Sequence, residues 1–204
     1  MQDSNQIKIL FLAAAPSDEP PLCIDKELRD IREALQQAQE RRFVLEYRGA
    51  LRPRDISQAI LHVKPQIVHF SGHGKNTGEL CFENNSGKAQ PVSANALAEL
   101  FKEVGEEIKC VLLNACHAEA QAKAIAEHIP FVIGMNQTII DKAAIAFSVG
   151  FYKALAAGRT IEKAYNLGCV EIQLEDIPEH LKPVLYKKKY FCPRFAACNS
   201  AGTS

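Results

Sequence analysis

The 204-residue sequence lacks the features that mark several large classes of protein. Lys and Arg together number 24, as do Asp and Glu, so the formal net charge is zero. A neutral chain without a long basic run gives no electrostatic reason to expect binding to nucleic acid or to an anionic membrane surface. Its apolar runs are also much shorter than the roughly 20 residues that span a bilayer. We therefore expect neither nucleic-acid binding nor a membrane-embedded segment.

Two further absences concern cofactors. The first apolar run leads into AAAPSDEPP, which contains neither the G-x-G-x-x-G nor the G-x-x-x-x-G-K-[ST] loop that cradles nucleotide phosphates. The histidines and cysteines show no recognisable zinc-ligand spacing. A nucleotide-binding or other small-molecule-binding protein is therefore the least favoured class, and we expect no cofactor and no metal.

Cysteine occurs seven times, an odd number with irregular spacing and no C-x-x-C pair. This pattern does not predict a regular disulfide framework and favours free thiols in a reducing compartment. The N-terminus lacks a basic region ahead of its short apolar run, so we interpret this run as a strand and not as a secretory signal. Together these observations predict a cytoplasmic protein.

Apolar residues alternate between the period of a strand and the period of a helix along most of the chain. Continuous apolar runs are typical of strands buried on both faces of a parallel sheet. Between these runs, apolar residues recur at helical spacing. The predicted strands are residues 7–14, 43–47, 67–70, 110–115 and 131–135. This order predicts an α/β fold: a three-layer sandwich with a mostly parallel central sheet and helices on both faces.

Shorter signals complete the predicted fold. An alternating run at residues 79–83, followed by the turn sequence NNSG, predicts a small side hairpin. Ser93, Asp141 and Thr160 each precede a helical pattern and are predicted N-caps. The pattern weakens late in the chain, where residues 184–186 are a candidate last strand.

The length of the chain bounds the number of domains. A chain of 204 residues can build one domain with a sizeable core and is too short for two comfortable ones. We therefore predict a single domain over residues 1–190 and an irregular C-terminal tail over residues 191–204.

Two of the predicted strands end in residues with unusual chemistry. The third, IVHFSGHG, ends at His73 between two glycines, and the fourth, CVLLNACHA, ends at Cys116. In a parallel sheet, ligands gather beyond the carboxyl ends of the strands, and neighbouring strands lie roughly 5 Å apart. If these strands are neighbours, His73 and Cys116 face one crevice, where an imidazole can take the proton of a nucleophilic thiol. The N–H groups of Gly74 and Cys116 can then stabilise an oxyanion, and Gly72 leaves room for a substrate backbone.

Three segments, in order, carry a resemblance to a known family. They are HFSGHG, LLNACHA and VIGMNQTIIDKAAIAFSVGFYKALAAGRTIEKAY, within residues 7–165. On these motifs the chain resembles the CHAT family of caspase-like cysteine peptidases, in the clan that also includes caspases, metacaspases, separases and gingipains. The resemblance implies a caspase-like sandwich with His73 as general acid/base and Cys116 as nucleophile. It also implies an oxyanion hole formed by the N–H groups of Gly74 and Cys116.

The resemblance also implies an activity and a partner. A CHAT protein of this kind is expected to be an endopeptidase that cleaves a protein or peptide substrate through an acyl-enzyme, without a metal. Relatives usually attach this domain to sensor or repeat modules, so a regulatory domain or a partner protein is expected here. The alternative is a catalytically latent or inactive caspase-like domain that serves in interaction or scaffolding.

One residue departs from the family pattern. Relatives that cut after Arg or Lys often carry Asp two residues before the nucleophile, where this chain has Asn114. An amide does not pair with a cation as a carboxylate does, so strict basic specificity is not implied. Asp141 is a second candidate for that charge, although its N-cap role is favoured. We count Gly72, Asn114 and Asp141 with the substrate-binding residues.

The remaining cysteines and histidines receive structural interpretations. Buried cysteines usually act as small apolar residues, and we assign that role to Cys23, Cys81, Cys110, Cys169, Cys192 and Cys198. His69 shares strand parity with His73, so it lines the base of the crevice or packs in the core. His117 is expected to orient a loop and receives no catalytic role.

Overall fold

The computed structural model describes residues 6–36 and 42–188 of the chain. Its main strands are β1 (Gln6–Ala13), β2 (Arg42–Arg48), β3 (Ile67–Ser71), β6 (Cys110–Asn114), β7 (Phe131–Met135) and β8 (Pro183–Lys187). They form one sheet in the order β2-β1-β3-β6-β7-β8. Every neighbouring pair is parallel except β7 and β8, which are antiparallel. The predicted mostly parallel sheet is therefore confirmed.

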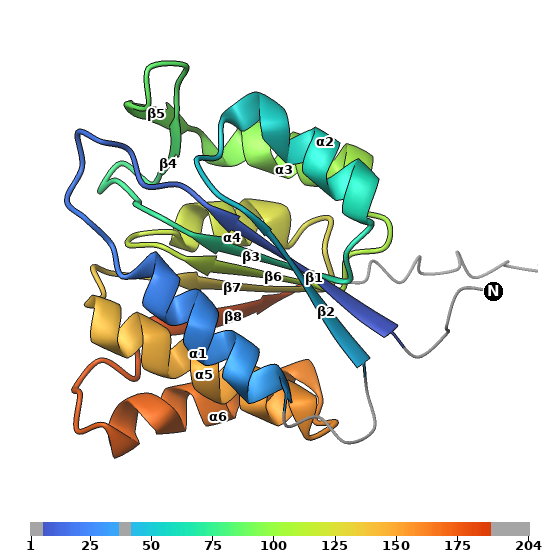
Figure 1. The fold of residues 1–204 in the computed structure, drawn as a ribbon, viewed down its shortest axis with the longest axis vertical. Coiled ribbons are helices and arrows are strands. Elements are labelled where there is room, and N and C mark those ends of the chain that lie inside the picture. Colours follow the sequence, from blue (N-terminus) through green and yellow to red (C-terminus); the bar gives the residue numbers. More distant parts are fainter. Residues whose placement is uncertain (1–5, 37–41, 189–204) are drawn as a thin grey trace, which may run out of the picture.

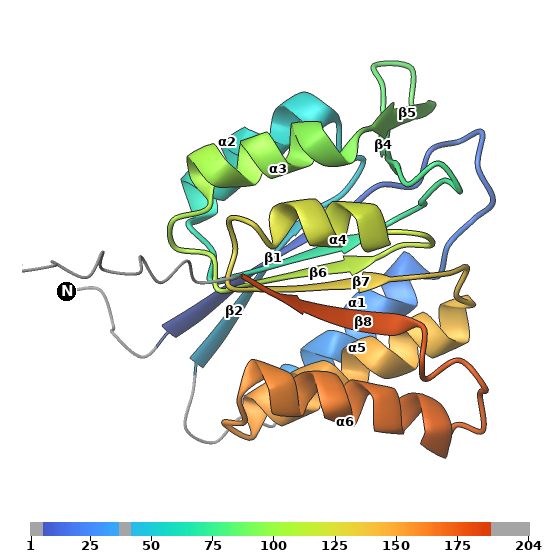
Figure 2. The same cartoon turned by 180° about the vertical axis from the view of Figure 1, so that it is seen from behind.

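Within the described ranges, six helices cover the sheet on its two faces, which confirms the three-layer arrangement (Figure 1). They are α1 (Ile24–Gln36), α2 (Pro53–Val63), α3 (Ala94–Val104), α4 (Glu119–Ile125), α5 (Asp141–Ala156) and α6 (Ile161–Leu174). Helices α1, α5 and α6 lie on one face, and α2, α3 and α4 lie on the other. Figure 2 shows the same layers from behind, with β8 at one edge of the sheet.

The strands are apolar on both sides because each face of the sheet carries its own core. In β1, Ile9 and Phe11 belong to the core beneath α1, α5 and α6. Leu10 and Leu12, which point the other way, belong to the core beneath α2, α3 and α4. All four side chains are at most 2% exposed. This two-sided burial is why the sequence shows continuous apolar runs and no strict alternation.

The predicted side hairpin is present as β4 (Leu80–Glu83) and β5 (Ala89–Val92), which pair antiparallel. It lies at the end of the α2 and α3 layer, beyond the sheet (Figure 1). The loop between β1 and α1 reaches this hairpin. There the Ser17 N–H donates to the Gly87 carbonyl at 2.8 Å, and the Ala89 N–H donates to Asp18 Oδ1 at 2.7 Å. The hairpin thereby fixes the first half of that loop.

Two of the three predicted N-caps are confirmed and one is wrong. Ser93 accepts a hydrogen bond from the Ala96 N–H, and Thr160 accepts one from the Lys163 N–H. Asp141, in contrast, is the first residue of α5, and Ile140 occupies the cap position without a side-chain hydrogen bond. The reason is tertiary, because the Asp141 carboxylate accepts a backbone hydrogen bond from the β1–α1 loop instead.

The last predicted strand, residues 184–186, is present within β8. The tail expected over residues 191–204 lies outside the described residues. Among the helices of the described ranges, none combines the length and the apolarity needed to cross a bilayer.

Candidate active site

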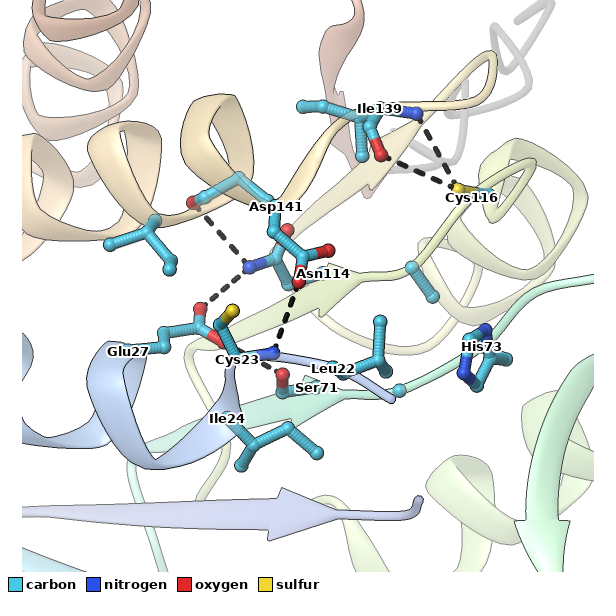
Figure 3. Close-up of a pocket in the computed structure, with 14 residues that line it drawn as sticks. Leu22, Cys23, Ile24, Glu27, Ser71, His73, Asn114, Cys116, Ile139 and Asp141 are labelled. Atoms are coloured by element: carbon cyan, nitrogen blue, oxygen red, sulfur yellow. Dashed lines mark hydrogen bonds between the residues drawn. The ribbon is translucent and has the colours of Figure 1, made fainter. Parts of the chain in front are cut away.

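Strands β3 and β6 are parallel neighbours, and their last residues, Ser71 and Asn114, lie opposite one another. Two residues further along each chain come His73 and Cys116. Both side chains reach a pocket of about 570 Å³ at the carboxyl edge of the sheet, part of it open to solvent (Figure 3). Of the residues predicted from sequence, this pocket is lined by Gly72, His73, Asn114, Cys116 and Asp141.

The His73 imidazole is held by the loop between β1 and α1. Its Nε2 lies 2.8 Å from the Pro20 carbonyl oxygen. Because a carbonyl can only accept, Nε2 carries the hydrogen, and in the neutral ring Nδ1 keeps the lone pair. The Pro20 carbonyl therefore determines which ring nitrogen can take up a proton.

The Cys116 thiol is engaged by the backbone of Ile139, in the loop after β7. Its Sγ accepts a hydrogen bond from the Ile139 N–H at 3.5 Å and donates to the Ile139 carbonyl at 3.7 Å. Figure 3 shows the sulfur turned toward Ile139, with His73 on the neighbouring strand end. Within the described ranges, no hydrogen bond joins Cys116 to His73. Contact between the two requires the sulfur to rotate away from Ile139, and catalytic hydrogen bonds often tighten only in the complex with substrate.

Gly74 lies against the backbone of Cys116. A Cβ at Gly74 would fall 1.8 Å from the Cys116 carbonyl oxygen, so only glycine permits this approach. In the part of the chain that the structure describes, neither the Gly74 N–H nor the Cys116 N–H donates to a protein acceptor. Two backbone donors are therefore free beside the sulfur.

The site contains a buried carboxylate, Glu27 of α1, which the sequence analysis missed. Glu27 is 3% exposed and lines the pocket. Its Oε2 accepts a hydrogen bond from Ser71 Oγ at 2.7 Å, and its Oε1 accepts one from Asn114 Nδ2 at 2.6 Å. Oε1 also accepts from Ser148 Oγ at 2.8 Å and lies 3.1 Å from His69 Nε2. Four polar side chains thus surround one carboxylate.

A signal for Glu27 exists in the sequence. The apolar face of α1 includes Ile24, Leu28 and Ile31, and Glu27 falls on this same face. An acidic residue among apolar neighbours at helical spacing indicates either a buried partner or a functional group. The spacing alone does not name the partners, which come from β3, β6 and α5.

The environment of Glu27 keeps its carboxyl ionised. Burial by itself would raise the pKa of this group. The charge and hydrogen bond of His69, together with the hydrogen bonds from Ser71 and Ser148, outweigh burial and hold the pKa of Glu27 below its ordinary value. The pocket therefore has a negative charge at its base at neutral pH.

His69 packs in the core and does not line the pocket. It is fully buried, and its ring stacks on Phe11 with 4.5 Å between the ring centroids. Its Nδ1 lies 3.2 Å from the Tyr152 hydroxyl and its Nε2 faces Glu27. Of the two interpretations open from sequence, core packing is the one observed. Within the core, both ring nitrogens of His69 face polar groups.

Cys23 is not the buried structural cysteine that we expected. It is exposed, it lines the pocket, and its N–H donates to Asp141 Oδ2 at 3.0 Å. A hydrogen bond to Asp141 and the charge of that carboxylate raise the pKa of the Cys23 thiol. The expectation fails because Cys23 lies in the loop just before α1, where it borders the pocket and is not part of the core.

Most of the other sulfur and imidazole groups lie away from the pocket. Cys81 and Cys110 are buried, and burial strongly raises the pKa of Cys110. Cys192 and Cys198 lie outside the described residues. Across residues 6–36 and 42–188, no group of three His, Cys, Asp or Glu side chains is arranged to hold a metal ion.

His117 joins two of the loops at the edge of the sheet. Its φ of 53° places it in the left-handed region, and its Nε2 lies 2.9 Å from Thr138 Oγ1. The loop after β6 is therefore tied to the loop after β7, which also carries Ile139.

The fold matches that of caspase-like proteins. Caspase-1 from Spodoptera frugiperda superposes with a TM-score of 0.58 at 11% sequence identity, over 91% of this chain and 91% of that chain. The fold and the two parallel strand ends thus define a caspase-like α/β sandwich. The model of the CHAT domain matches residues 8–167, and the chain belongs to the CHAT domain family.

Two curated relatives have names that indicate proteolysis. A Roc-COR-CHAT protease from an unknown prokaryotic organism is 27% identical over 179 residues, which cover 84% of this chain and 17% of the relative. A probable protease from Gillisia limnaea is 29% identical over 153 residues, which cover 74% of this chain and 27% of the relative. The chain thus spans a minor part of the length of these relatives.

Replacing Asn114 with Asp tests the charge at the base of the pocket. Asn114→Asp would set a second buried carboxyl beside Glu27 Oε1, where the amide now donates at 2.6 Å. Repulsion between like charges raises the pKa of the introduced carboxyl above its unfolded-state value. Such a group is tolerated at low pH and costs stability as the pH rises through its folded-state pKa. We expect the variant's free energy of unfolding to fall increasingly below that of the parent between about pH 5 and 8, by on the order of 3 kcal/mol.

Asn114→Ala is the matched control because it removes the donor without adding charge. Its loss of stability should vary much less with pH over the same range. Thermal unfolding followed by circular dichroism measures both variants. A deficit for Asn114→Asp that stays constant with pH would contradict the ionised state of Glu27.

Proposed function

We propose that the chain is a cysteine peptidase in which Cys116 is the nucleophile and His73 is the general acid/base. The observation that carries this proposal is the in-register end of β3 and β6, which brings a thiol and an imidazole to one pocket. The CHAT family membership and the protease names of the relatives support it. The substrate is a protein or peptide segment that lies across the mouth of the pocket.

The proposed reaction proceeds by acyl transfer. Cys116 Sγ leaves Ile139, gives its proton to Nδ1 of His73 and attacks the scissile carbonyl carbon. The oxyanion that forms is stabilised by the N–H groups of Gly74 and Cys116. His73 then protonates the leaving amine, and water, deprotonated by the same ring, releases the acyl group. The Pro20 carbonyl keeps the ring in the tautomer that these steps require.

We further propose that residues 1–190 act as one catalytic domain in the cytoplasm. A single sheet that runs from Gln6 to Lys187 supports one domain. The cysteines of the described ranges are free, as expected for a reducing compartment. These are Cys23, Cys81, Cys110, Cys116 and Cys169.

Removing either member of the dyad tests the proposed chemistry. Cys116→Ala and His73→Ala should each abolish cleavage in a proteome-derived peptide library, because one loses the nucleophile and the other loses its base. Circular dichroism should show that both variants keep the fold. A peptide-based electrophile should label Cys116 ahead of Cys23, which shares the pocket but whose thiol pKa is raised. Equal labelling of the two cysteines would argue against an activated thiol.

The charge of the pocket predicts which side chains it rejects. Glu27 and Asp141 both line the pocket, and no Lys or Arg side chain lines it within the described ranges. Peptides with Asp immediately before the cleaved bond should therefore be cut at least about tenfold more slowly, in kcat/KM, than isosteric peptides with Asn there. Steady-state kinetics on the matched pair measures this ratio. Equal rates for the two peptides would show that the pocket does not receive that side chain.

Control by a further domain or a partner protein is also proposed. The greater length of the Roc-COR-CHAT relative supports it, as does the engagement of the Cys116 thiol by Ile139 and not by His73. We expect the isolated chain to cleave peptides slowly and a longer natural polypeptide or an added partner to raise kcat. Assays of wild type and Cys116→Ala, with and without the partner, measure this effect. Full activity of the isolated chain would exclude such control, and silence under every condition would favour a scaffold domain.

A further inference from the structure

Ser71 and Asn114 occupy equivalent places on the two strands of the proposed dyad. Ser71 ends β3 two residues before His73, and Asn114 ends β6 two residues before Cys116. The two are register partners across the sheet. Both are buried, at 5% and 6% exposure. Any contact that joins these residues therefore acts directly at the base of the two loops.

One carboxylate joins them. Glu27 accepts from Ser71 through Oε2 at 2.7 Å and from Asn114 through Oε1 at 2.6 Å. Both distances are short, as is usual for hydrogen bonds to an ionised acceptor, which are stronger than neutral ones. Glu27 belongs to α1, in the helical layer. Its bonds to the two strand ends are therefore additional to the backbone hydrogen bonds that pair β3 with β6.

Stability alone does not account for a carboxylate at this place. An apolar residue on the buried face of α1 would pack there without the cost of desolvating a charge. For this reason, replacing a buried ion pair with well-packed apolar residues is often neutral or stabilising. The bonds to Glu27 instead add direction, because each fixes the rotamer of a strand-end side chain.

We propose that Glu27 is a positioning residue of the active site, which holds the ends of β3 and β6 so that His73 and Cys116 meet in one geometry. This inference rests on the proposed peptidase function. Glu27 itself does not contact the sulfur or the imidazole of the dyad in the described structure. Its effect passes through Ser71 and Asn114, two residues from each reacting group.

Two buried serines provide a matched pair of variants. Ser71 and Ser148 donate to Glu27 at 2.7 and 2.8 Å, and they are 5% and 0% exposed. Ser71 lies on the strand that leads to His73, whereas Ser148 lies on α5. Ser71→Ala and Ser148→Ala therefore remove the same kind of bond from the same carboxylate. Only the first removes a strand-end side chain that donates to Glu27, while the second also removes a longer contact, 3.4 Å from Asn114 Nδ2 to Ser148 Oγ.

The readout is the rate at which iodoacetamide alkylates Cys116, followed by mass spectrometry of the Cys116 peptide. This small reagent reports the coupling of thiol and imidazole without filling the pocket. We expect Ser71→Ala to slow alkylation and kcat by on the order of tenfold more than Ser148→Ala, with similar losses in thermal midpoint, since small misplacements of reacting groups are costly. Equal effects of the two variants would overturn the positioning role.

The His73→Ala variant separates this inference from the function on which it rests. If, under conditions in which wild type cleaves peptides, alkylation of Cys116 is as fast in His73→Ala as in wild type, the dyad itself is wrong and the positioning role falls with it. If His73→Ala slows alkylation while Ser71→Ala and Ser148→Ala behave alike, only the positioning role is wrong.

Glu27→Gln separates positioning from direct recognition of a substrate side chain. The amide keeps the shape of the side chain but loses the charge that orients its partners. A positioning residue should lower kcat by a similar factor for peptides with Arg and with Leu before the cleaved bond, with little change in KM. A loss confined to the Arg peptide would overturn the proposal and assign Glu27 to substrate binding.

Discussion

The parallel pairing of β3 with β6 is the constraint on which the rest of the site depends. The ladder advances one residue at a time from Ile67 opposite Cys110 to Ser71 opposite Asn114. Side chains alternate across a sheet, so a slip of one residue would turn those of one strand to the other face. Such a slip would carry Ser71 or Asn114 away from Glu27 and toward the apolar core on the opposite face of the sheet. The loops of the proposed dyad therefore leave the sheet at the same level.

Two further groups position the site, the Pro20 carbonyl and the Glu27 carboxylate. Both lie in one segment, which consists of the β1–α1 loop and the first turn of α1. The loop is bonded at one end to the β4–β5 hairpin and at the other to Asp141 at the start of α5. Between these anchors, the Pro20 carbonyl orients His73. One turn into α1, Glu27 reaches both strand ends. This single segment thus contacts both strand ends of the site, that of His73 and that of Cys116. The sheet alone brings these strand ends near each other but does not orient their side chains.

The sequence predicts the fold well because the two-sided burial of parallel strands leaves long apolar runs, such as 7–14 in β1. It predicts the site less completely, for reasons that are tertiary. Asp141 looks like an N-cap because its local pattern is that of one, yet a backbone donor at Cys23, 118 residues earlier in the chain, takes its carboxylate. Glu27 stands out on the face of its helix, but its partners lie on three other elements. The roles of His73 and Cys116 remain a prediction, carried by their motifs and by the pocket they share.

The pairing of Asn114 with Glu27 changes how the departure from the family pattern is understood. Considered alone, an amide two residues before the proposed nucleophile suggests a pocket without negative charge. In the structure the charge lies on Glu27, and the amide donates to it at 2.6 Å. Two carboxylates at that distance in a buried place would not both remain ionised. Asn114 is therefore compatible with the charge on Glu27 in a way that Asp at this position would not be, and the charge of the pocket depends on both residues together.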